Sequence, residues 1–127
     1  MDDVQRDVIA FLRDPSSYRP GAGPVDIIET HASIVFLAGK RAYKLKRTVK
    51  YPYLDFSTPA LRLAACTAEL RLNRRTAPQL YLEVRAISRL PDGSLVWGRP
   101  GGDHTTDPLD FVVVMRRFEQ RDRKSVV

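Results

Sequence analysis

Ala42 and Lys44 are the residues whose types and spacing point most directly to chemistry. They stand two apart in a run that favours a β-strand, residues 42–46, so their side chains are expected on one face of that strand. A small side chain lets a flat ring lie against the sheet, and an ammonium group beside it reaches phosphates attached to that ring. The pair therefore predicts a site for a nucleotide.

A lysine in this role needs a carboxylate to hold its flexible side chain in place. Glu69 is the predicted partner, because it belongs to the helix expected directly after the lysine strand and lies at the edge of an apolar stripe. Lys46 is expected on the same strand face and competes with Lys44 for the phosphate. Glu83, near the start of a later strand, is the weaker carboxylate candidate. The competing interpretation is that Lys44 and Glu69 are ordinary surface residues.

A short turn, His31-Ala32-Ser33, joins two of the expected strands. Its backbone amides and the Ser33 hydroxyl can approach a phosphate, but less closely than glycines would allow, because the turn contains no glycine. His31 is interpreted as a turn or packing residue rather than a catalyst. Ser33 is therefore the predicted phosphate contact of this turn.

Other kinds of site find little support in the sequence. Cys66, His31 and His104 form no spaced set of zinc ligands. Gly101-Gly102 lacks the flanking lysine and the serine or threonine of a phosphate-binding P-loop. His104 precedes the last expected strand and no asparagine follows it, so it is not assigned to a catalytic loop. We predict neither a metal site nor a catalytic residue in this chain.

Hydrophobic spacing and turn signals predict the elements that would position these residues. Helices are expected over residues 2–13 and 58–76, the second capped by Ser57 or Thr58. Pro91-Asp92-Gly93 is a strong signal for a hairpin turn. A connector is expected over 14–24 and a loop over 48–57. Strands are expected over residues 25–30, 34–38, 42–46, 81–89, 95–98 and 110–115.

The helix over 58–76 carries apolar residues on two sides. One side holds Leu61, Ala65, Ala68 and Leu72, and the opposite side holds Leu63, Cys66 and Leu70. This pattern predicts a helix that is contacted from two directions, by its own sheet and by something else.

Length and composition bound the fold class. A chain of 127 residues with 43% hydrophobic and 28% charged residues is typical of one globular domain. We predict an α+β fold, a five- or six-stranded antiparallel sheet with one main packed helix and a short N-terminal helix. No run approaches the roughly 18 apolar residues of a membrane span. The start Met-Asp-Asp is unlike a secretory signal, and the single Cys66 cannot form an internal disulfide, so a cytoplasmic location without a membrane partner is expected.

Charge offers an alternative function. The formal net charge is +6, and residues 40–50 carry six basic residues and no acid. A small basic module could bind nucleic acid or another polyanion through residues 40–50 and 71–75. Tyr43, Tyr51 and Tyr53 would then stack on bases. Nucleic acid is the less favoured partner, because ordinary solvated surface also accounts for such stretches.

Four stretches of the chain carry a family resemblance: Glu29–Lys46, Tyr53–Ser57, Glu69–Arg75 and Val114–Phe118. In combination they resemble the start of bacterial aminoglycoside-phosphotransferase-family proteins, which have a kinase-like fold and are sometimes fused to a P-loop ATP-binding domain. The resemblance implies a kinase-like small lobe over residues 25–118, preceded by a helix and connector over 1–24. It also implies that the full-length protein binds ATP and magnesium and transfers a phosphoryl group to an unknown acceptor hydroxyl.

The resemblance also implies roles for individual residues. Lys44 would contact the α- and β-phosphates, with Glu69 orienting it. Met115 to Arg117 would form the hinge whose backbone bonds the adenine edge, and Val113 and Val114 would line the adenine pocket. The bland alternative for 110–115 is a plain core strand. The implied nucleotide-binding set is Ser33, Ala42, Lys44, Glu69, Val114, Met115 and Arg116.

The end of the chain bears on activity. In kinase-like folds the aspartates and asparagine that orient the acceptor and hold magnesium follow the hinge, and only nine residues follow Phe118. We therefore expect residues 119–127 to be a truncated end, and the isolated chain to be inactive without a missing C-terminal catalytic lobe. We further hypothesise that residues 122–127, Asp-Arg-Lys-Ser-Val-Val, are an artefactual tail, because their codons can spell a common sequencing-library adapter.

Overall fold

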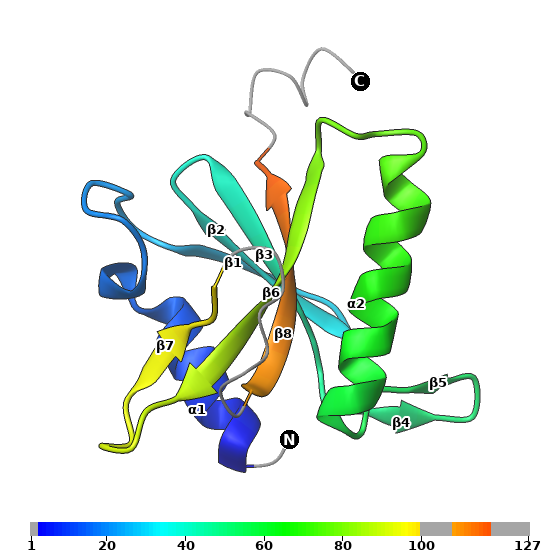
Figure 1. The fold of residues 1–127 in the computed structure, drawn as a ribbon, viewed down its shortest axis with the longest axis horizontal. Helices are drawn as coiled ribbons and strands as arrows, with labels where there is room; N and C mark the ends of the chain where they lie inside the picture. Colours follow the sequence, from blue (N-terminus) through cyan, green and yellow to red (C-terminus); the bar gives the residue numbers. More distant parts are fainter. Residues whose placement is uncertain (1–2, 100–107, 118–127) are drawn as a thin grey trace.

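A computed structural model describes residues 3–99 and 108–117 (Figure 1). It contains two α-helices, one short 3₁₀ helix and eight strands within these ranges. In chain order they are α1 (Asp3–Arg13), η1 (Pro15–Ser17), β1 (Asp26–Glu29), β2 (Ser33–Ala38), β3 (Arg41–Lys46), β4 (Lys50–Tyr51), β5 (Leu54–Asp55), α2 (Pro59–Arg74), β6 (Tyr81–Arg89), β7 (Leu95–Trp97) and β8 (Pro108–Arg116).

Six of the strands form one antiparallel sheet in the order β1-β2-β3-β8-β6-β7, so β3 and β8 lie at its centre. The strands β4 and β5 pair separately as a two-stranded hairpin. The predicted α+β class, its antiparallel sheet and its two helices are confirmed. The hairpin expected around Pro91-Asp92-Gly93 is confirmed as β6 and β7.

The two helices cover opposite faces of the sheet (Figure 1). Val8 and Leu12 of α1 pack with Tyr43 and Val114, whereas Cys66 of α2 packs with Val113. Successive residues of a strand point to opposite faces, so Val113 and Val114 belong to different cores. The chain therefore buries two small apolar layers, one on each face of the central strands.

Local signals explain where α2 begins. The Thr58 side chain accepts a hydrogen bond from the Leu61 backbone N–H over 3.2 Å, and Pro59 occupies the first turn.

A buried polar cluster lies next to the first turn of α2. Arg62 is 2% exposed and its Nε donates to Asp110 Oδ1 over 2.9 Å. Gln5 of α1 donates to the other oxygen of the same carboxylate over 2.9 Å. This buried polar cluster ties both helices to β8.

One expectation about the region around α2 is wrong, and the second contact expected on its outer side stays a prediction. Residues 48–57 are not only a loop, because they contain β4 and β5, whose short pairing the sequence pattern did not reveal. The α2 side that carries Leu61 and Leu72 is not packed, since these side chains are 40% and 62% exposed. Within the described ranges α2 is thus covered on one side only.

Some expectations concern residues outside the described ranges. These are Gly101, Gly102, His104, Phe118 and the predicted tail at 122–127. In the part of the chain that the structure describes, no helix is long and apolar enough to cross a membrane.

Candidate functional site

The side of β3 that faces α2 carries Ala42, Lys44 and Lys46, as the alternation of the strand predicts. The register of β3 is set by the two-residue turn Gly39-Lys40, in which Gly39 has a φ of 60°. A positive φ at the first turn residue suits the twist of the flanking strands and favours glycine there. The hairpin turn thus determines which β3 side chains face α2.

Glu69 of α2 lies between the two lysines. Its Oε2 is 3.2 Å from Lys44 Nζ, and its Oε1 contacts Lys46 Nζ. The Lys44 side chain is 29% exposed and that of Lys46 is 8% exposed. The structure therefore brings the two predicted partners Lys44 and Glu69 together, and of the competing lysines Lys44 is the more accessible to a ligand.

The position of Glu69 follows from the packing of α2. Cys66, one turn earlier, is fully buried against Phe111 and Val113, so this side of the helix faces the sheet. Glu69 comes three residues later and therefore lies on the same side, over β3. Leu63 also packs on this core, whereas Leu72 of the other apolar stripe is exposed.

Electrostatics keep Glu69 ionised. Burial alone would raise its pKa, but the hydrogen bonds and charges of Lys46 and Lys44 outweigh burial and lower the pKa below its ordinary value. Burial also raises the pKa of the Cys66 thiol to about 12. Cys66 is thus a packing residue and not a thiolate nucleophile.

An apolar cleft lies on the same face of the sheet as this ion pair, and Val35, one of its lining residues, pairs with Lys44 across β2 and β3. Its volume is about 220 Å³, and Ala42 forms part of its floor. Pockets for drug-sized ligands measure roughly 300–1,000 Å³, so this cleft suits one ring system rather than a whole nucleotide. Its lining residues are Ile28, Val35, Leu37, Ala42, Leu80, Tyr81, Met115, Arg116 and Arg117.

The implied hinge meets this cleft, but its backbone donors are already used. Met115, Arg116 and Arg117 line the cleft. The Arg116 N–H donates to Leu80 O over 2.8 Å, and the Arg117 N–H donates to Lys40 O over 2.9 Å. The expected hydrogen bonds from these two amides to an adenine edge are therefore not open in this conformation. Contacts from this segment would come from carbonyl oxygens and side chains.

Two other implied ligand contacts need correction. Val114 is fully buried in the core on the α1 face, and Val113 is fully buried in the core on the α2 face, where it packs with Cys66. Neither valine lines the cleft. The Ser33 N–H donates to Thr30 Oγ1 over 3.0 Å, and Ser33 is 7% exposed. The turn before β2 thus presents no open amide at Ser33.

The basic stretch at residues 40–50 does not form one surface. Lys44 and Lys46 face Glu69, while Arg47 Nη1 donates to Thr30 O over 3.0 Å. Tyr43 is 8% exposed and buried on the opposite face. The stretch is divided because successive strand residues alternate between faces.

The β4–β5 hairpin carries a stack of two tyrosine rings. The rings of Tyr51 and Tyr53 stack with centroids 5.7 Å apart, and Tyr53 is 74% exposed. The His31 ring lies 5.9 Å from that of Tyr51. The interpretation of His31 as a turn or packing residue agrees with this contact.

Comparison with known proteins gives relatives but no function. No family model matches this chain, and no solved structure matches it. Uncharacterized proteins of Mycobacterium bovis and Mycobacterium tuberculosis are 41% identical to it over 99 residues, which is 78% of this chain. The chain spans 17% of the length of these curated relatives.

Proposed function

We propose that this chain is the ATP-binding lobe of a kinase-like phosphotransferase. The observation that carries the proposal is the Lys44–Glu69 ion pair of 3.2 Å on the sheet face that also holds an apolar cleft, which is lined by Ala42, two residues before Lys44. A ring in the cleft would lie against Ala42, and the ammonium of Lys44 would meet the phosphates attached to it. The resemblance to the start of aminoglycoside-phosphotransferase-family proteins supports the same assignment.

The two lysines would have different tasks. Lys44 is the phosphate contact, because its side chain is the more exposed of the two. Lys46 is nearly buried and holds the second oxygen of Glu69, so that the carboxylate is fixed from both sides. A fixed carboxylate limits the conformations of Lys44, and this positions its charge before a nucleotide arrives.

The proposal for the whole protein extends further. The chain spans 17% of its curated relatives, and we place the acceptor site and the acidic residues of phosphoryl transfer in the remainder of such a protein. Magnesium would neutralise charge on the ATP phosphates, and no described residue of this chain is assigned to it.

Nucleotide binding by the 127-residue chain tests the proposal. We expect isothermal titration with ATP and magnesium to show binding that Lys44→Ala weakens roughly tenfold, because a charge-assisted contact to phosphate is lost. Lys50→Ala removes an exposed lysine from β4 and is the matched control, expected to leave affinity unchanged. Equal affinities of wild type and Lys44→Ala, with both proteins folded by circular dichroism, would contradict the proposal.

Nucleic-acid binding is the second candidate, favoured by the exposed stack of Tyr51 and Tyr53 beside Lys50. Stacked tyrosines next to a basic residue suit single-stranded nucleic acid. A gel shift that weakens with salt, is lost in Tyr53→Ala and is unaffected by ATP would support this candidate. Retention of the shift in Tyr53→Ala would argue against it.

A further inference from the structure

A second, larger pocket lies on the opposite face of the sheet from the apolar cleft that Ala42 lines. Its volume is about 620 Å³, within the range of roughly 300–1,000 Å³ that holds whole small molecules. Tyr43 lines it, and Tyr43 and Lys44 point to opposite faces because they are adjacent in β3. The lining residues come from the connector after α1 and from the sheet: Ser17, Tyr18, Arg19, Gly21, Ala22, Ala38, Gly39, Lys40, Arg41, Tyr43, Leu82, Arg85, Trp97 and Arg116.

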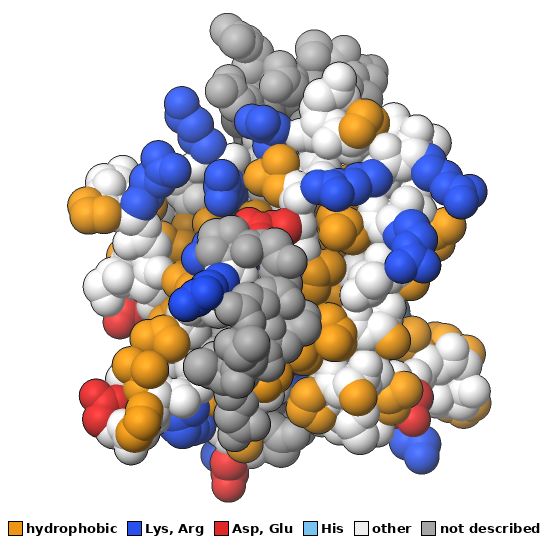
Figure 2. All heavy atoms as spheres, in the orientation of Figure 1, with side chains coloured by type: hydrophobic (Ala, Val, Ile, Leu, Met, Phe, Trp, Pro, Cys, Tyr) orange, Lys and Arg blue, Asp and Glu red, His pale blue; other side chains and the backbone are white. Residues whose placement is uncertain are grey.

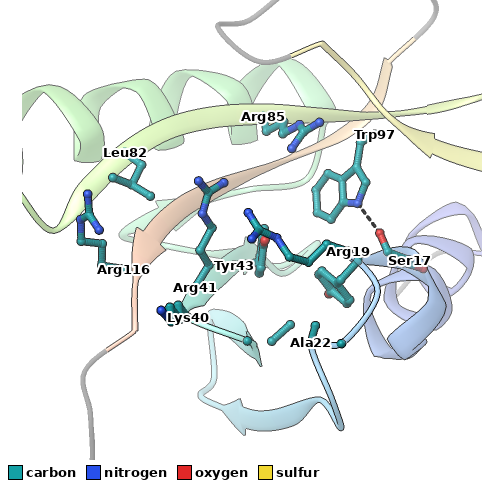
Figure 3. Close-up of a pocket in the computed structure, with 14 residues that line it drawn as sticks. Ser17, Arg19, Ala22, Lys40, Arg41, Tyr43, Leu82, Arg85, Trp97 and Arg116 are labelled. Carbon is teal, nitrogen blue, oxygen red and sulfur yellow. Dashed lines mark hydrogen bonds between the residues drawn. The ribbon is translucent and has the colours of Figure 1, made fainter.

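Positive charge dominates this pocket. Its charged lining residues are Arg19, Lys40, Arg41, Arg85 and Arg116, and none of the lining residues is acidic. In Figure 3 the side chains of Arg19 and Arg41 extend toward one another across the pocket. Figure 2 shows several Lys and Arg side chains on the upper part of the molecular face that is drawn there. These residues are far apart in sequence, so the fold creates the cluster.

The wall of the pocket holds one arginine in a defined orientation. The Arg85 Nε donates to Gly98 O over 3.0 Å, and its guanidinium lies 5.2 Å from the centre of the Trp97 ring. Trp97 Nε1 in turn donates to Ser17 O over 2.7 Å (Figure 3). Arg85 is therefore arranged before any ligand arrives, which lowers the ordering cost of binding.

Electrostatics of the wall point to an anion. Burial raises the pKa of Tyr43, while the charges of Arg41, Arg85 and Arg19 act in the opposite direction, so its hydroxyl stays protonated near neutral pH. The cations that line the pocket repel one another, and a bound anion reduces this cost. Glu83 of β6 lies on the same face of the sheet, since it pairs with Val114, but it does not line the pocket. Arginine is also the side chain whose geometry best matches phosphate oxygens.

We propose that this pocket binds a small molecule that carries a chain of phosphoryl groups. Several guanidinium groups around one space suit several phosphoryl groups better than a single carboxylate. Such a chain occurs in nucleoside polyphosphates and in inorganic polyphosphate, and the basic lining residues suit the phosphoryl chain that both share. The site lies on the other face of the sheet from the proposed ATP site, and Arg116, at the end of β8, is the one described residue that lines both.

The single tryptophan makes the test direct, because Trp97 lines the pocket and is the only tryptophan of the chain. Inorganic tripolyphosphate is titrated into the 127-residue chain at about 150 mM salt, a concentration that screens weak surface charge, and tryptophan fluorescence is followed. We expect saturable binding that Arg41→Gln weakens roughly tenfold. Arg71→Gln, an exposed arginine on α2, is the matched control and should bind like the wild type.

Additional variants and ligands in the same titration distinguish this proposal from the ATP-site proposal and distinguish the two classes of ligand. Lys44→Ala should leave tripolyphosphate binding unchanged, so failure of the ATP-site proposal and failure of this one give different results. If Arg41→Gln does not fold, Arg19→Gln, which alters an exposed residue with no ion pair among the described residues, should still weaken binding. Tighter binding of ATP than of tripolyphosphate at this site would identify a nucleoside polyphosphate, and weaker binding of ATP would identify inorganic polyphosphate. No saturable binding, or equal weakening by Arg71→Gln, would overturn the proposal.

Discussion

Glu69 neutralises two ammonium groups whose surroundings differ. Lys46 is 8% exposed and depends on Glu69 for its charge partner, whereas Lys44 is 29% exposed and retains contact with solvent. Removing the carboxylate charge would leave Lys46 nearly buried without compensation, and an uncompensated buried group is costly. The same substitution would also free Lys44. One residue thus serves both the stability of the sheet–helix contact and the orientation of the proposed phosphate contact.

We predict that Glu69→Gln destabilises the chain by roughly 1–3 kcal/mol at pH 7, measured by urea unfolding. The loss should depend on pH, because the pKa of Glu69 is lowered in the folded chain by Lys46 and Lys44 against the opposing effect of burial. The unfolded state therefore binds more protons than the folded state at acidic pH, and stability rises with pH. The stabilisation that ionised Glu69 provides is complete above pH 4.5, the ordinary pKa of a glutamate side chain. It is lost as the pH falls through the lower pKa that Glu69 has in the folded chain.

The matched control for this prediction is Lys44→Gln. Because Lys44 is the more exposed lysine, this change should cost less stability than Glu69→Gln while weakening nucleotide binding. The gap in unfolding free energy between wild type and Glu69→Gln should narrow below pH 4.5. A gap that widens toward acidic pH would show that the ion pairs do not contribute in the assigned way.

At the scale of the elements, β3 presents one face to each pocket, and Ala42 is the residue that keeps the α2-side cleft open. We predict that Ala42→Leu fills the cleft and lowers ATP affinity at least roughly tenfold, since the added side chain would occupy the place of the ring. Stability should fall by about 1–3 kcal/mol at most, because Ala42 is buried but the added atoms can extend into the cleft that it lines. Titration with ATP and urea unfolding of the same samples measure both quantities.

An alanine-to-leucine substitution outside the cleft is the control for Ala42→Leu. Ala68→Leu adds an equal volume on the exposed side of α2 and should leave ATP affinity unchanged. Normal ATP affinity in Ala42→Leu would place the ring somewhere other than this cleft. Loss of affinity in both variants would point to a general effect on α2 and β3.

The sequence predicted those features of the elements that depend on local pattern. Alternation along β3 was enough to place Ala42 and Lys44 on one face, and the cap at Thr58 and the turn at residues 91–93 marked the ends of elements. The inward side of α2 was harder, because both sides carry leucines and only the packing of Cys66 on the sheet distinguishes them. Val114 was misplaced for a related reason: a strand buried on both faces shows no alternation.

Features that depend on distant pairs were not visible in the sequence. Arg62 and Asp110 are 48 residues apart, and a charge in an apolar strand is the only local sign that Asp110 has a buried partner. The second pocket is lined by Arg19, Arg41 and Arg85, which belong to three separate segments of the chain. No single stretch of sequence therefore predicts it. Spatial neighbours brought together by topology cannot be read from spacing along the chain.

At the scale of the whole molecule, the buried polar cluster connects the two faces of the sheet. Asp110 of β8 accepts from Arg62 of α2 over 2.9 Å and from Gln5 of α1 over 2.9 Å. Gln5 also donates to Lys46 O over 3.1 Å, next to the Glu69 ion pair. Both helices, and with them the cleft on one face and the pocket on the other, are therefore held to the centre of the sheet through one carboxylate.

We predict that Asp110→Asn destabilises the chain by about 3–5 kcal/mol, because it leaves the guanidinium of Arg62, whose side chain is 3% exposed, without a charge partner. Burial raises the pKa of Asp110 above its ordinary value, and the charge of Arg62 and the hydrogen bond from Gln5 offset only part of this rise. The double variant Arg62→Met with Asp110→Leu removes both charges and should be more stable than Asp110→Asn alone. Urea unfolding of Arg62→Met, of Asp110→Leu and of the double variant that combines them completes a double-mutant cycle and measures the coupling. Additive losses in the double variant would mean that the ion pair does not join the helices to the sheet.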